Sequence, residues 1–310
     1  MSINQISKES ENTPLIIRAK TIGFCMGVRR AVETAYKALD EHPDKRVWTL
    51  GPLIHNKITL ESLSKRGVNV LKEEDIKSLG KNDVVIIRAH GVSPKIKDDL
   101  SVQGCTTIDA TCPRVMRNQK QASTLALDDF TVFIAGDKNH GEVTGIAGCA
   151  IDKNGNNKSI LIGNRSDAED FILQYKNNSI TFPSKAVLIS QTTISPTEFN
   201  AIAEVLKKEI PELQVFDTIC PATKERQDAL RNLKNQVEGV LIIGGKNSAN
   251  TQRLLMTAQN LFEYATLIET ADEIPDIFFT LKSVGLSAGA STPDEVIDSV
   301  EKRLTYINQQ

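Results

Sequence analysis

The sequence has few cysteines and no long apolar run. Five cysteines among 310 residues are too few for a disulfide framework, so we expect a reducing compartment, the cytoplasm. The longest apolar stretches, such as Val240–Ile243, are far shorter than the roughly 20 residues that span a bilayer. Residues 1–14 contain no apolar segment typical of a secretion signal, and we expect them to form a disordered tail.

The chain also lacks an excess of charge of either sign. Its Lys and Arg residues number 37 and its Asp and Glu residues 39, which gives a net charge of −2 at pH 7. No global field would hold nucleic acid or an anionic membrane, so we expect neither as a partner. Any bound anion must be held by local groups.

Two short patterns recur in one register. The pattern Asp-x-x-Cys-Pro contains Cys112 and again Cys220, and the pattern Gly-x-Lys-Asn begins at Gly136 and again at Gly244. Both pairs are 108 positions apart (220 − 112 and 244 − 136). An apolar stretch that ends in Ser-Pro or Thr-Pro occurs three times, at Pro94, Pro196 and Pro293. The repeated unit is therefore about a hundred residues long and is used three times.

Each repeat alternates predicted helices with strands that are rich in Val and Ile. This order predicts α/β units with mostly parallel sheets. The last third ends in a helix near 293–304 and lacks a final strand, whereas a strand at 15–20 precedes the first repeat. We therefore predict three similar small α/β domains in a ring, at residues 26–111, 112–217 and 218–303, with strand 15–20 completing the third.

Three of the five cysteines, Cys25, Cys112 and Cys220, directly precede predicted helices. The free N–H groups and the positive end of the helix dipole favour a thiolate there, which is the form that binds metal. In the predicted ring these cysteines face one axis, and thiolate-only ligation is typical of iron–sulfur clusters. A zinc ion, metal-free thiol chemistry and a purely structural role remain alternatives. Cys105 and Cys149 lie in strand-like stretches and are predicted to be small buried apolar residues.

Polar side chains gather where the predicted strands end. Ligands of open α/β sheets bind beyond the carboxyl ends of the strands. With few fixed cations nearby, His, Ser, Thr and Asn can hold a phosphate through hydrogen bonds, together with the amides of helix N-termini. The residues that predict such a site are His55, His90, His140, Glu142, Thr192, Ser248, Asn250 and Ser291.

A series of ordered motifs includes these residues: Gly23-Phe-Cys25-x-Gly27-Val, His55-Asn56, Arg88-Ala-His90-Gly-Val-Ser, Asp109-Ala-Thr-Cys112-Pro, His140-x-Glu142-Val, Ser190-Gln-Thr192-Thr193, Cys220-x-Ala-Thr, Lys246-Asn247-Ser248-x-Asn250-Thr and Ala288-Gly-Ala-Ser291-x-Pro293. From about Leu15 to Arg303 the chain resembles the LytB family of 4-hydroxy-3-methylbut-2-enyl diphosphate reductases. The resemblance implies a pseudo-threefold trefoil of three α/β domains around a central 4Fe–4S cluster.

The resemblance also implies the last step of the non-mevalonate isoprenoid pathway, a two-electron reductive dehydroxylation that gives isopentenyl and dimethylallyl diphosphate. It implies reduced ferredoxin or flavodoxin as the electron donor. Glu142 resembles the proton source, and Thr192 the hydroxyl that positions the substrate oxygen. The implied cluster ligands are Cys25, Cys112 and Cys220, and the implied diphosphate-binding residues are His55, His90, His140, Ser248, Asn250 and Ser291. Ala249 stands where many relatives carry Ser, which removes one hydroxyl contact.

Two other functions fit part of the pattern. A quinolinate-synthase-like iron–sulfur dehydratase also has three domains and three cysteines, but it would not need the histidines and Glu142 at these turns. An iron–sulfur sensor would be expected to carry a basic helix or another partner-binding face, and the sequence shows no long Lys/Arg cluster.

Overall fold

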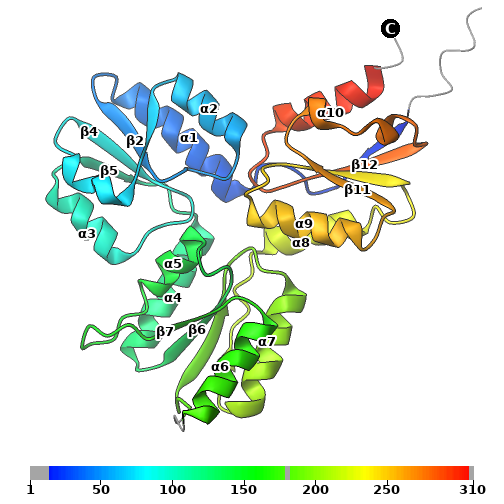
Figure 1. The fold of residues 1–310 in the computed structure, drawn as a ribbon. Helices are drawn as coiled ribbons and strands as arrows, with labels where there is room; N and C mark the ends of the chain where they lie inside the picture. Colours follow the sequence, from blue (N-terminus) through cyan, green and yellow to red (C-terminus); the bar gives the residue numbers. More distant parts are fainter. Residues whose placement is uncertain (1–13, 179–181, 307–310) are drawn as a thin grey trace, which may run out of the picture. The chain divides into compact units, whose positions relative to one another are not determined.

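The computed structural model describes residues 14–178 and 182–306 and contains three four-stranded sheets, each with its own helices (Figure 1). All strand pairs within these sheets are parallel, as the alternating pattern predicted. The predicted disordered tail, residues 1–14, lies outside the described residues except for Pro14. In the described ranges, no helix is both long enough and apolar enough to cross a membrane.

The first sheet has the strand order β3-β2-β4-β5. Its central strand β4 is buried along its whole length, which explains its continuous apolar sequence Val-Val-Ile-Ile after Asp83. The strands are β2 (Arg46–Leu50), β3 (Val68–Leu71), β4 (Asp83–Ile87) and β5 (Thr106–Asp109). The helices of this region are α1 (Met26–Glu41), α2 (Lys57–Lys65), the 3₁₀ helix η1 (Glu73–Ser78) and α3 (Pro94–Val102).

The second sheet has the order β7-β6-β8-β9 and is covered on both faces. Alternate residues of β6 serve opposite faces: Phe133 packs among residues of α6 and α7, and Ile134 packs among residues of α4 and α5. The strands are β6 (Thr131–Ala135), β7 (Ser159–Ile162), β8 (Ala186–Ser190) and β9 (Gln214–Val215). The helices are α4 (Pro113–Leu127), α5 (Gly141–Ala147), α6 (Arg165–Asn177) and α7 (Pro196–Glu209).

The third sheet has the order β1-β12-β10-β11 and combines both ends of the described chain. Strand β1 pairs with β12 from Leu15 opposite Ser283 to Arg18 opposite Leu286. The strands are β1 (Leu15–Arg18), β10 (Gly239–Ile243), β11 (Tyr264–Ile268) and β12 (Ser283–Ala288). The helices are α8 (Pro221–Arg231), α9 (Ala249–Gln259), η2 (Ala271–Glu273), η3 (Asp276–Phe279) and α10 (Asp294–Tyr306).

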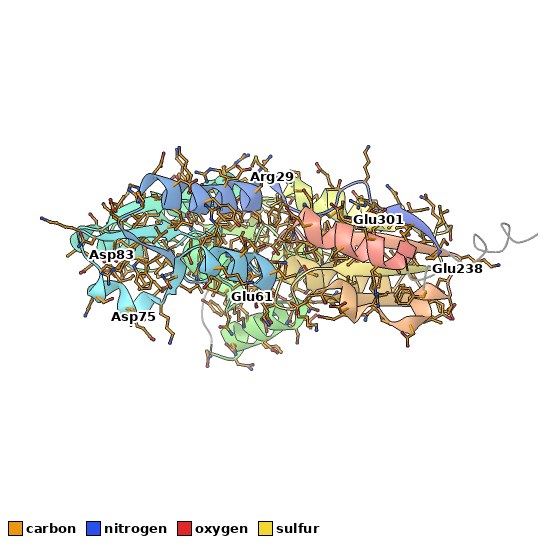
Figure 2. The ribbon with its side chains drawn as sticks, turned by 90° about the horizontal axis from the view of Figure 1, so that it is seen from above. Arg29, Glu61, Asp75, Asp83, Glu238 and Glu301 are labelled. Atoms are coloured by element: carbon orange, nitrogen blue, oxygen red, sulfur yellow. The ribbon has the colours of Figure 1, made fainter. Side chains whose placement is uncertain are left out.

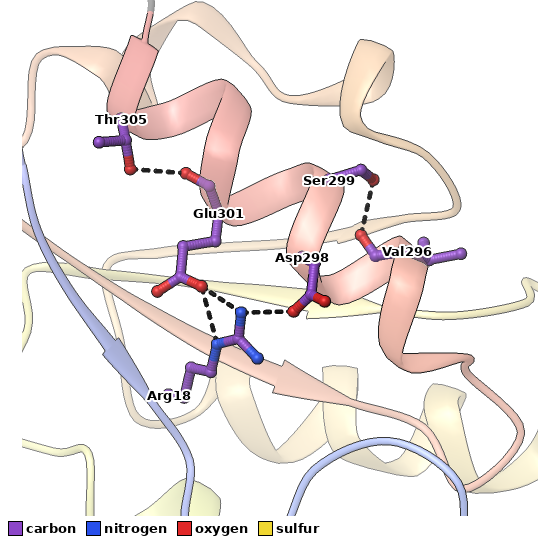
Figure 3. A network of polar contacts seen from close by, with 6 residues as sticks. All are labelled: Arg18, Val296, Asp298, Ser299, Glu301 and Thr305. Atoms are coloured by element: carbon purple, nitrogen blue, oxygen red, sulfur yellow. Dashed lines mark hydrogen bonds and ion pairs between the residues drawn. The ribbon is translucent and has the colours of Figure 1, made fainter.

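Strand β1 is also tied to helix α10 through its last residue (Figure 3). The Arg18 guanidinium donates from Nη2 to Asp298 at 2.7 Å and from Nε to Glu301 at 2.9 Å. These two carboxylates raise the pKa of Arg18, against an opposing effect of partial burial. The N-terminal strand is therefore held to the third sheet by its ladder and to the last helix by its side chain.

All three sheets share one topology. In each sheet the second strand pairs with one edge of the first strand, the third strand pairs with the other edge, and the fourth strand pairs with the third. In the third sheet β1 takes the place of the fourth strand, and up to residue 306 no strand follows β12. The direction of winding reverses between the first and third strands, and ligands of such sheets bind at this switch point.

By compactness the described chain divides into two units. One contains residues 14–25, 55–59 and 221–306 and holds the third sheet. The other contains residues 26–54, 60–178 and 182–220 and holds the first and second sheets. The short segment that carries His55 therefore belongs with the third sheet. The three-domain boundaries at 26–111, 112–217 and 218–303 remain a prediction.

A buried carboxylate stabilises the first sheet at the start of β4. Asp83 is fully buried and is labelled in Figure 2. It accepts hydrogen bonds from the Trp48 indole and from the Gly80 amide, both at 2.8 Å, and it pairs with Arg46 at 2.8 Å. Burial acts to raise the pKa of Asp83, but these bonds outweigh it, and the pKa lies below its usual value.

Candidate active site

All three candidate cysteines lie at the start of a helix, as predicted. Cys25 directly precedes α1, Cys112 is the N-cap residue of α4, and Cys220 directly precedes α8. All three residues are partly exposed.

The other two cysteines differ in their surroundings. Cys149 is buried, and burial raises the pKa of its thiol to about 11, so it is protonated at neutral pH. It follows the end of α5 rather than lying in a strand as the sequence suggested. Cys105 packs against the core of the first sheet, and its Sγ donates to the Leu100 carbonyl at 3.5 Å. Cys149 is buried as predicted, whereas Cys105 is only partly buried.

The repeated Asp-x-x-Cys-Pro pattern corresponds to a repeated turn. Asp109 accepts a hydrogen bond from the Thr111 amide at 2.9 Å, and Asp217 accepts one from the Ile219 amide at 3.1 Å. In both turns an aspartate side chain bonds the backbone two residues on, which is a common way to fix a turn. The chain then enters a helix whose first residue is proline. This local chemistry places Cys112 and Cys220 in similar positions.

The Cys112 thiol lies very close to the backbone of helix α1 at Gly27. A Cβ atom built on Gly27, in the first turn of α1, would lie 2.5 Å from Cys112 Sγ. The same region is held by Arg30, whose guanidinium donates to the Thr111 carbonyl at 2.9 Å. Only a glycine therefore fits at position 27 beside this sulfur. Gly27 is also only two residues from Cys25 in the chain, so the segment that begins at one candidate ligand packs against another, Cys112.

The other two cysteine turns are also held by buried polar side chains. Arg226 of α8, which begins right after Cys220, donates to the Gly23 carbonyl at 2.6 Å. Asn118 of α4 donates to the Thr218 carbonyl at 3.5 Å, and the Cys220 amide donates to the Thr192 carbonyl at 2.9 Å. Each cysteine turn is therefore fixed to another structural element by hydrogen bonds.

Glu142 and Thr192 form a buried pair. The Thr192 hydroxyl donates to Glu142 Oε2 at 2.8 Å, and its backbone amide donates to Oε1 at 2.6 Å. The two residues are only 2% and 7% exposed. Glu142 lies in the first turn of α5 and Thr192 lies two residues after the end of β8, so both occupy the carboxyl edge of the second sheet. A carboxyl group in contact with a hydroxyl can pass a proton through it.

Two histidines accompany this pair. His140 is the N-cap residue of α5, and its Nδ1 accepts a hydrogen bond from the Glu142 amide at 3.2 Å. In the neutral ring the proton therefore resides on Nε2, which makes that atom a hydrogen-bond donor. The His90 ring lies edge-on to the His140 ring, with 4.9 Å between the centroids. The structure thus brings together four of the predicted residues, His90, His140, Glu142 and Thr192.

The remaining predicted residues belong to the unit of the third sheet. The Ser291 hydroxyl donates to the His55 carbonyl at 3.1 Å. Ser248 is the N-cap residue of α9 and accepts a hydrogen bond from the Thr251 amide. Asn250 is 4% exposed, and its Nδ2 has no hydrogen-bond partner among the described residues. A buried amide donor without a protein partner is suited to bind an anionic oxygen.

Two residues of the site were not predicted, although both lie inside the recognised motifs. Gln191 is fully buried, accepts from the Asp137 amide at 2.9 Å and donates to the Thr193 hydroxyl at 2.8 Å. It therefore joins the turn that leads to His140 to the turn that contains Thr192. Arg88 directly follows β4 and is treated below. A polar residue at the end of a fully buried strand is the signal that could have identified both.

Fold and site together define a class of protein: a parallel α/β protein with helix-capping cysteines, a buried carboxyl–hydroxyl pair and polar groups suited to an anion. The family model of the LytB protein matches residues 16–305. The chain therefore belongs to the LytB family.

Similar proteins carry one name. A 4-hydroxy-3-methylbut-2-enyl diphosphate reductase of Treponema denticola is 46% identical over 94% of this chain and 99% of its own length. A protein of the same name from Caldanaerobacter subterraneus subsp. tengcongensis is 39% identical over 93% of this chain and 96% of its own.

Two solved structures are also similar. A structure of (E)-4-hydroxy-3-methyl-but-2-enyl diphosphate reductase, the terminal enzyme of the non-mevalonate pathway, aligns with a TM-score of 0.69. It is 35% identical and covers 94% of this chain and 100% of its own. The E-1-hydroxy-2-methyl-but-2-enyl-4-diphosphate reductase of Plasmodium falciparum aligns with a TM-score of 0.81 at 26% identity, over 92% of this chain and 86% of its own.

Proposed function

We propose that this protein reduces 4-hydroxy-3-methylbut-2-enyl diphosphate to isopentenyl and dimethylallyl diphosphate. The reaction consumes two electrons and two protons and releases the substrate hydroxyl as water. Relatives of this name align over nearly the whole chain. The observation that carries the proposal is the buried contact of Glu142 with Thr192, because the reaction needs a proton delivered to a hydroxyl oxygen.

We infer that Cys25, Cys112 and Cys220 hold a 4Fe–4S cluster. When bound, the cluster supplies electrons and an open iron for the substrate hydroxyl oxygen. The partly exposed thiols at three helix starts fit such a group. The close approach of Cys112 Sγ to Gly27 also supports it, since a Cβ atom at position 27 would lie 2.5 Å from the sulfur and displace it.

The protein side chains bind the substrate and move protons. Protonated Glu142 passes a proton through the Thr192 hydroxyl to the substrate oxygen, which then departs as water rather than as hydroxide. His140 donates from Nε2, and His55, His90, Ser248, Asn250 and Ser291 complete the hydrogen-bond donors for the diphosphate. Holding the diphosphate fixes the allylic group relative to the acid. Reduced ferredoxin or flavodoxin in the cytoplasm is the proposed electron donor.

Anaerobic purification followed by metal analysis and a reductase assay tests this function. We expect about four irons and four sulfides per chain, and formation of both diphosphate products with a chemical reductant. Replacing Cys25, Cys112 or Cys220 by Ser should remove iron, whereas Cys105→Ser and Cys149→Ser should retain it. A chain with one zinc and no sulfide would contradict the cluster. A fully loaded chain that forms neither product would contradict the reaction.

A further inference from the structure

Arg88 places a positive charge at the switch point of the first sheet. It directly follows β4, and its side chain is only 16% exposed. A Cβ atom on Gly51, which follows the neighbouring strand β2, would collide with Arg88 Nη1. The guanidinium thus lies against the residue that follows β2, at the carboxyl ends of β2 and β4, where ligands of parallel α/β sheets commonly bind.

The same guanidinium lies against the turn that carries His140 and Glu142. A Cβ atom on Gly141 would lie 2.9 Å from Nη2, 3.1 Å from Cζ and 3.2 Å from Nε of Arg88. Three similar distances mean that the planar group packs flat on the backbone of Gly141. Its charge is therefore next to the turn of His140, a residue predicted to bind the diphosphate, but it is not part of the Glu142–Thr192 pair.

The charge of Arg88 is poorly compensated within the described residues. Its one ion pair is with Glu73, at 3.5 Å, and the Glu73 carboxylate is 51% exposed. Arg88 Nε is buried and has no hydrogen-bond partner there. Burial lowers the pKa of Arg88, and Glu73 offsets this effect only in part. A buried cation usually has a close partner, because removing it from water is costly.

We propose that Arg88 determines the affinity of this site for the diphosphate, as a buried positive charge that the anionic substrate neutralises. This inference rests on the proposed function and adds a residue to it. A partly desolvated charge is screened less by water than an exposed one, so it attracts an anion across several ångströms. The anion in turn removes the cost of the uncompensated cation.

A purely structural role for Arg88 makes different predictions. If the flat packing on Gly141 alone mattered, Arg88→Lys would be as harmful as Arg88→Met, because lysine lacks the planar group. If the charge matters, Arg88→Lys retains most of the affinity. Removing the partner charge by Glu73→Gln should then tighten binding of the anion, although Glu73 is not part of the Glu142–Thr192 pair.

The test measures inhibition by inorganic diphosphate, together with KM and kcat, on the cluster-loaded protein with a chemical reductant. For Arg88→Met we expect Ki and KM to rise about tenfold with kcat within twofold, and for Arg88→Lys a change below about threefold. For Glu73→Gln we expect Ki to fall about twofold. Arg165→Gln, which removes an exposed guanidinium from α6, is the matched control and should change neither constant.

Unchanged Ki in Arg88→Met, equal loss in Arg88→Lys and Arg88→Met, or no effect of Glu73→Gln would each overturn the inference. If Arg88→Met does not fold, Glu73→Gln decides, because that exposed side chain can be changed without disturbing the core. A wild-type protein that neither turns over the substrate nor binds inorganic diphosphate would refute the proposed function itself. If the wild-type protein turns over the substrate and binds inorganic diphosphate, but Arg88→Met and Arg88→Lys have the same Ki and KM as each other, only the role of Arg88 is refuted.

Discussion

The carboxylate of Glu142 accepts two hydrogen bonds from a single residue, Thr192, 50 positions further along the chain. The hydrogen bond from the Thr192 backbone amide fixes the distance between α5 and the segment after β8. The hydrogen bond from the Thr192 hydroxyl connects the acid to a group that can contact a substrate. Since the amide holds one oxygen of Glu142, the other oxygen always faces the Thr192 hydroxyl. The pair is therefore preorganised for proton transfer before any substrate binds.

Glu142→Gln should abolish turnover while the substrate still binds. The amide keeps the size of the side chain but cannot supply the proton, so we expect kcat to fall about 10²- to 10⁴-fold with KM within a few-fold. Single-turnover product analysis and binding of inorganic diphosphate measure the two effects separately. Glu169→Gln, at an exposed carboxylate of α6, is the control. Retained turnover in Glu142→Gln would exclude Glu142 as the acid.

Gly27→Ala should lower the cluster content without unfolding the protein. The new methyl group would lie 2.5 Å from Cys112 Sγ, so either the sulfur or helix α1 must move. We expect less iron and sulfide per chain and weaker visible absorption after anaerobic reconstitution. Gly80→Ala is a matched control, because a Cβ atom there would meet nothing within 4 Å. Full loading of Gly27→Ala would show that Cys112 does not bind metal in this conformation.

Gln191→Leu should slow the reaction through loss of positioning. The substitution leaves the Asp137 amide and the Thr193 hydroxyl without their partner, at a cost of about 1–3 kcal/mol for each buried group left unsatisfied. We expect a lower midpoint of thermal unfolding and about a tenfold decrease in kcat, since the turns of His140 and Thr192 are no longer joined. Gln174→Leu, at an exposed position of α6, should be close to wild type. Unchanged kcat in Gln191→Leu would limit Gln191 to a structural role.

Asp83→Asn should destabilise the unit that contains the first sheet by about 3 kcal/mol, because a buried acceptor of charge-assisted bonds is lost. The pKa of Asp83 is lower in the folded than in the unfolded state, so its ionised form stabilises the fold above the usual pKa of an aspartate, about 3.9. That contribution is lost as the pH falls through the folded pKa.

Urea unfolding followed by fluorescence measures this effect, because the single tryptophan, Trp48, contacts Asp83 directly. The difference in free energy of unfolding between wild type and Asp83→Asn should shrink below about pH 4. Asp75→Asn, at an exposed aspartate that is also labelled in Figure 2, should show no such dependence. A constant difference at all pH values would mean that Asp83 is not ionised in the folded protein.

Much of the fold was predictable because its signals are local. Runs rich in Val and Ile predicted strands, and the structure has β4 over Asp83–Ile87 and β10 over Gly239–Ile243 at two such runs. The turns at Asp109 and Asp217 depend on a bond between residues two positions apart, so the repeat in sequence became a repeat in structure. The predicted strand at 15–20 is shorter in the structure, where β1 ends at Arg18.

Part of the site was not predictable, because it depends on contacts between distant segments. Arg88 and Gln191 were recognised only as motif members, since sequence does not show which polar side chain fills a crevice between strands. Arg88, which follows β4 of the first sheet, contacts Gly141 of α5, and Gln191 contacts Asp137 within the region of the second sheet, so both contacts arise only from tertiary packing. The convergence of Cys25, Cys112 and Cys220 remains a prediction.

The sequence by itself determined the order of strands and helices, the three-fold repeat and the placement of cysteines at helix starts, because periodicity, turn chemistry and proline act over a few residues. Only the tertiary structure decided which distant residues meet: Glu142 with Thr192, Gln191 with Asp137, and Arg88 with Gly141. Those contacts depend on how helices pack over the carboxyl edges of the sheets. Segments some fifty residues apart are brought within hydrogen-bond distance only after the whole chain has folded.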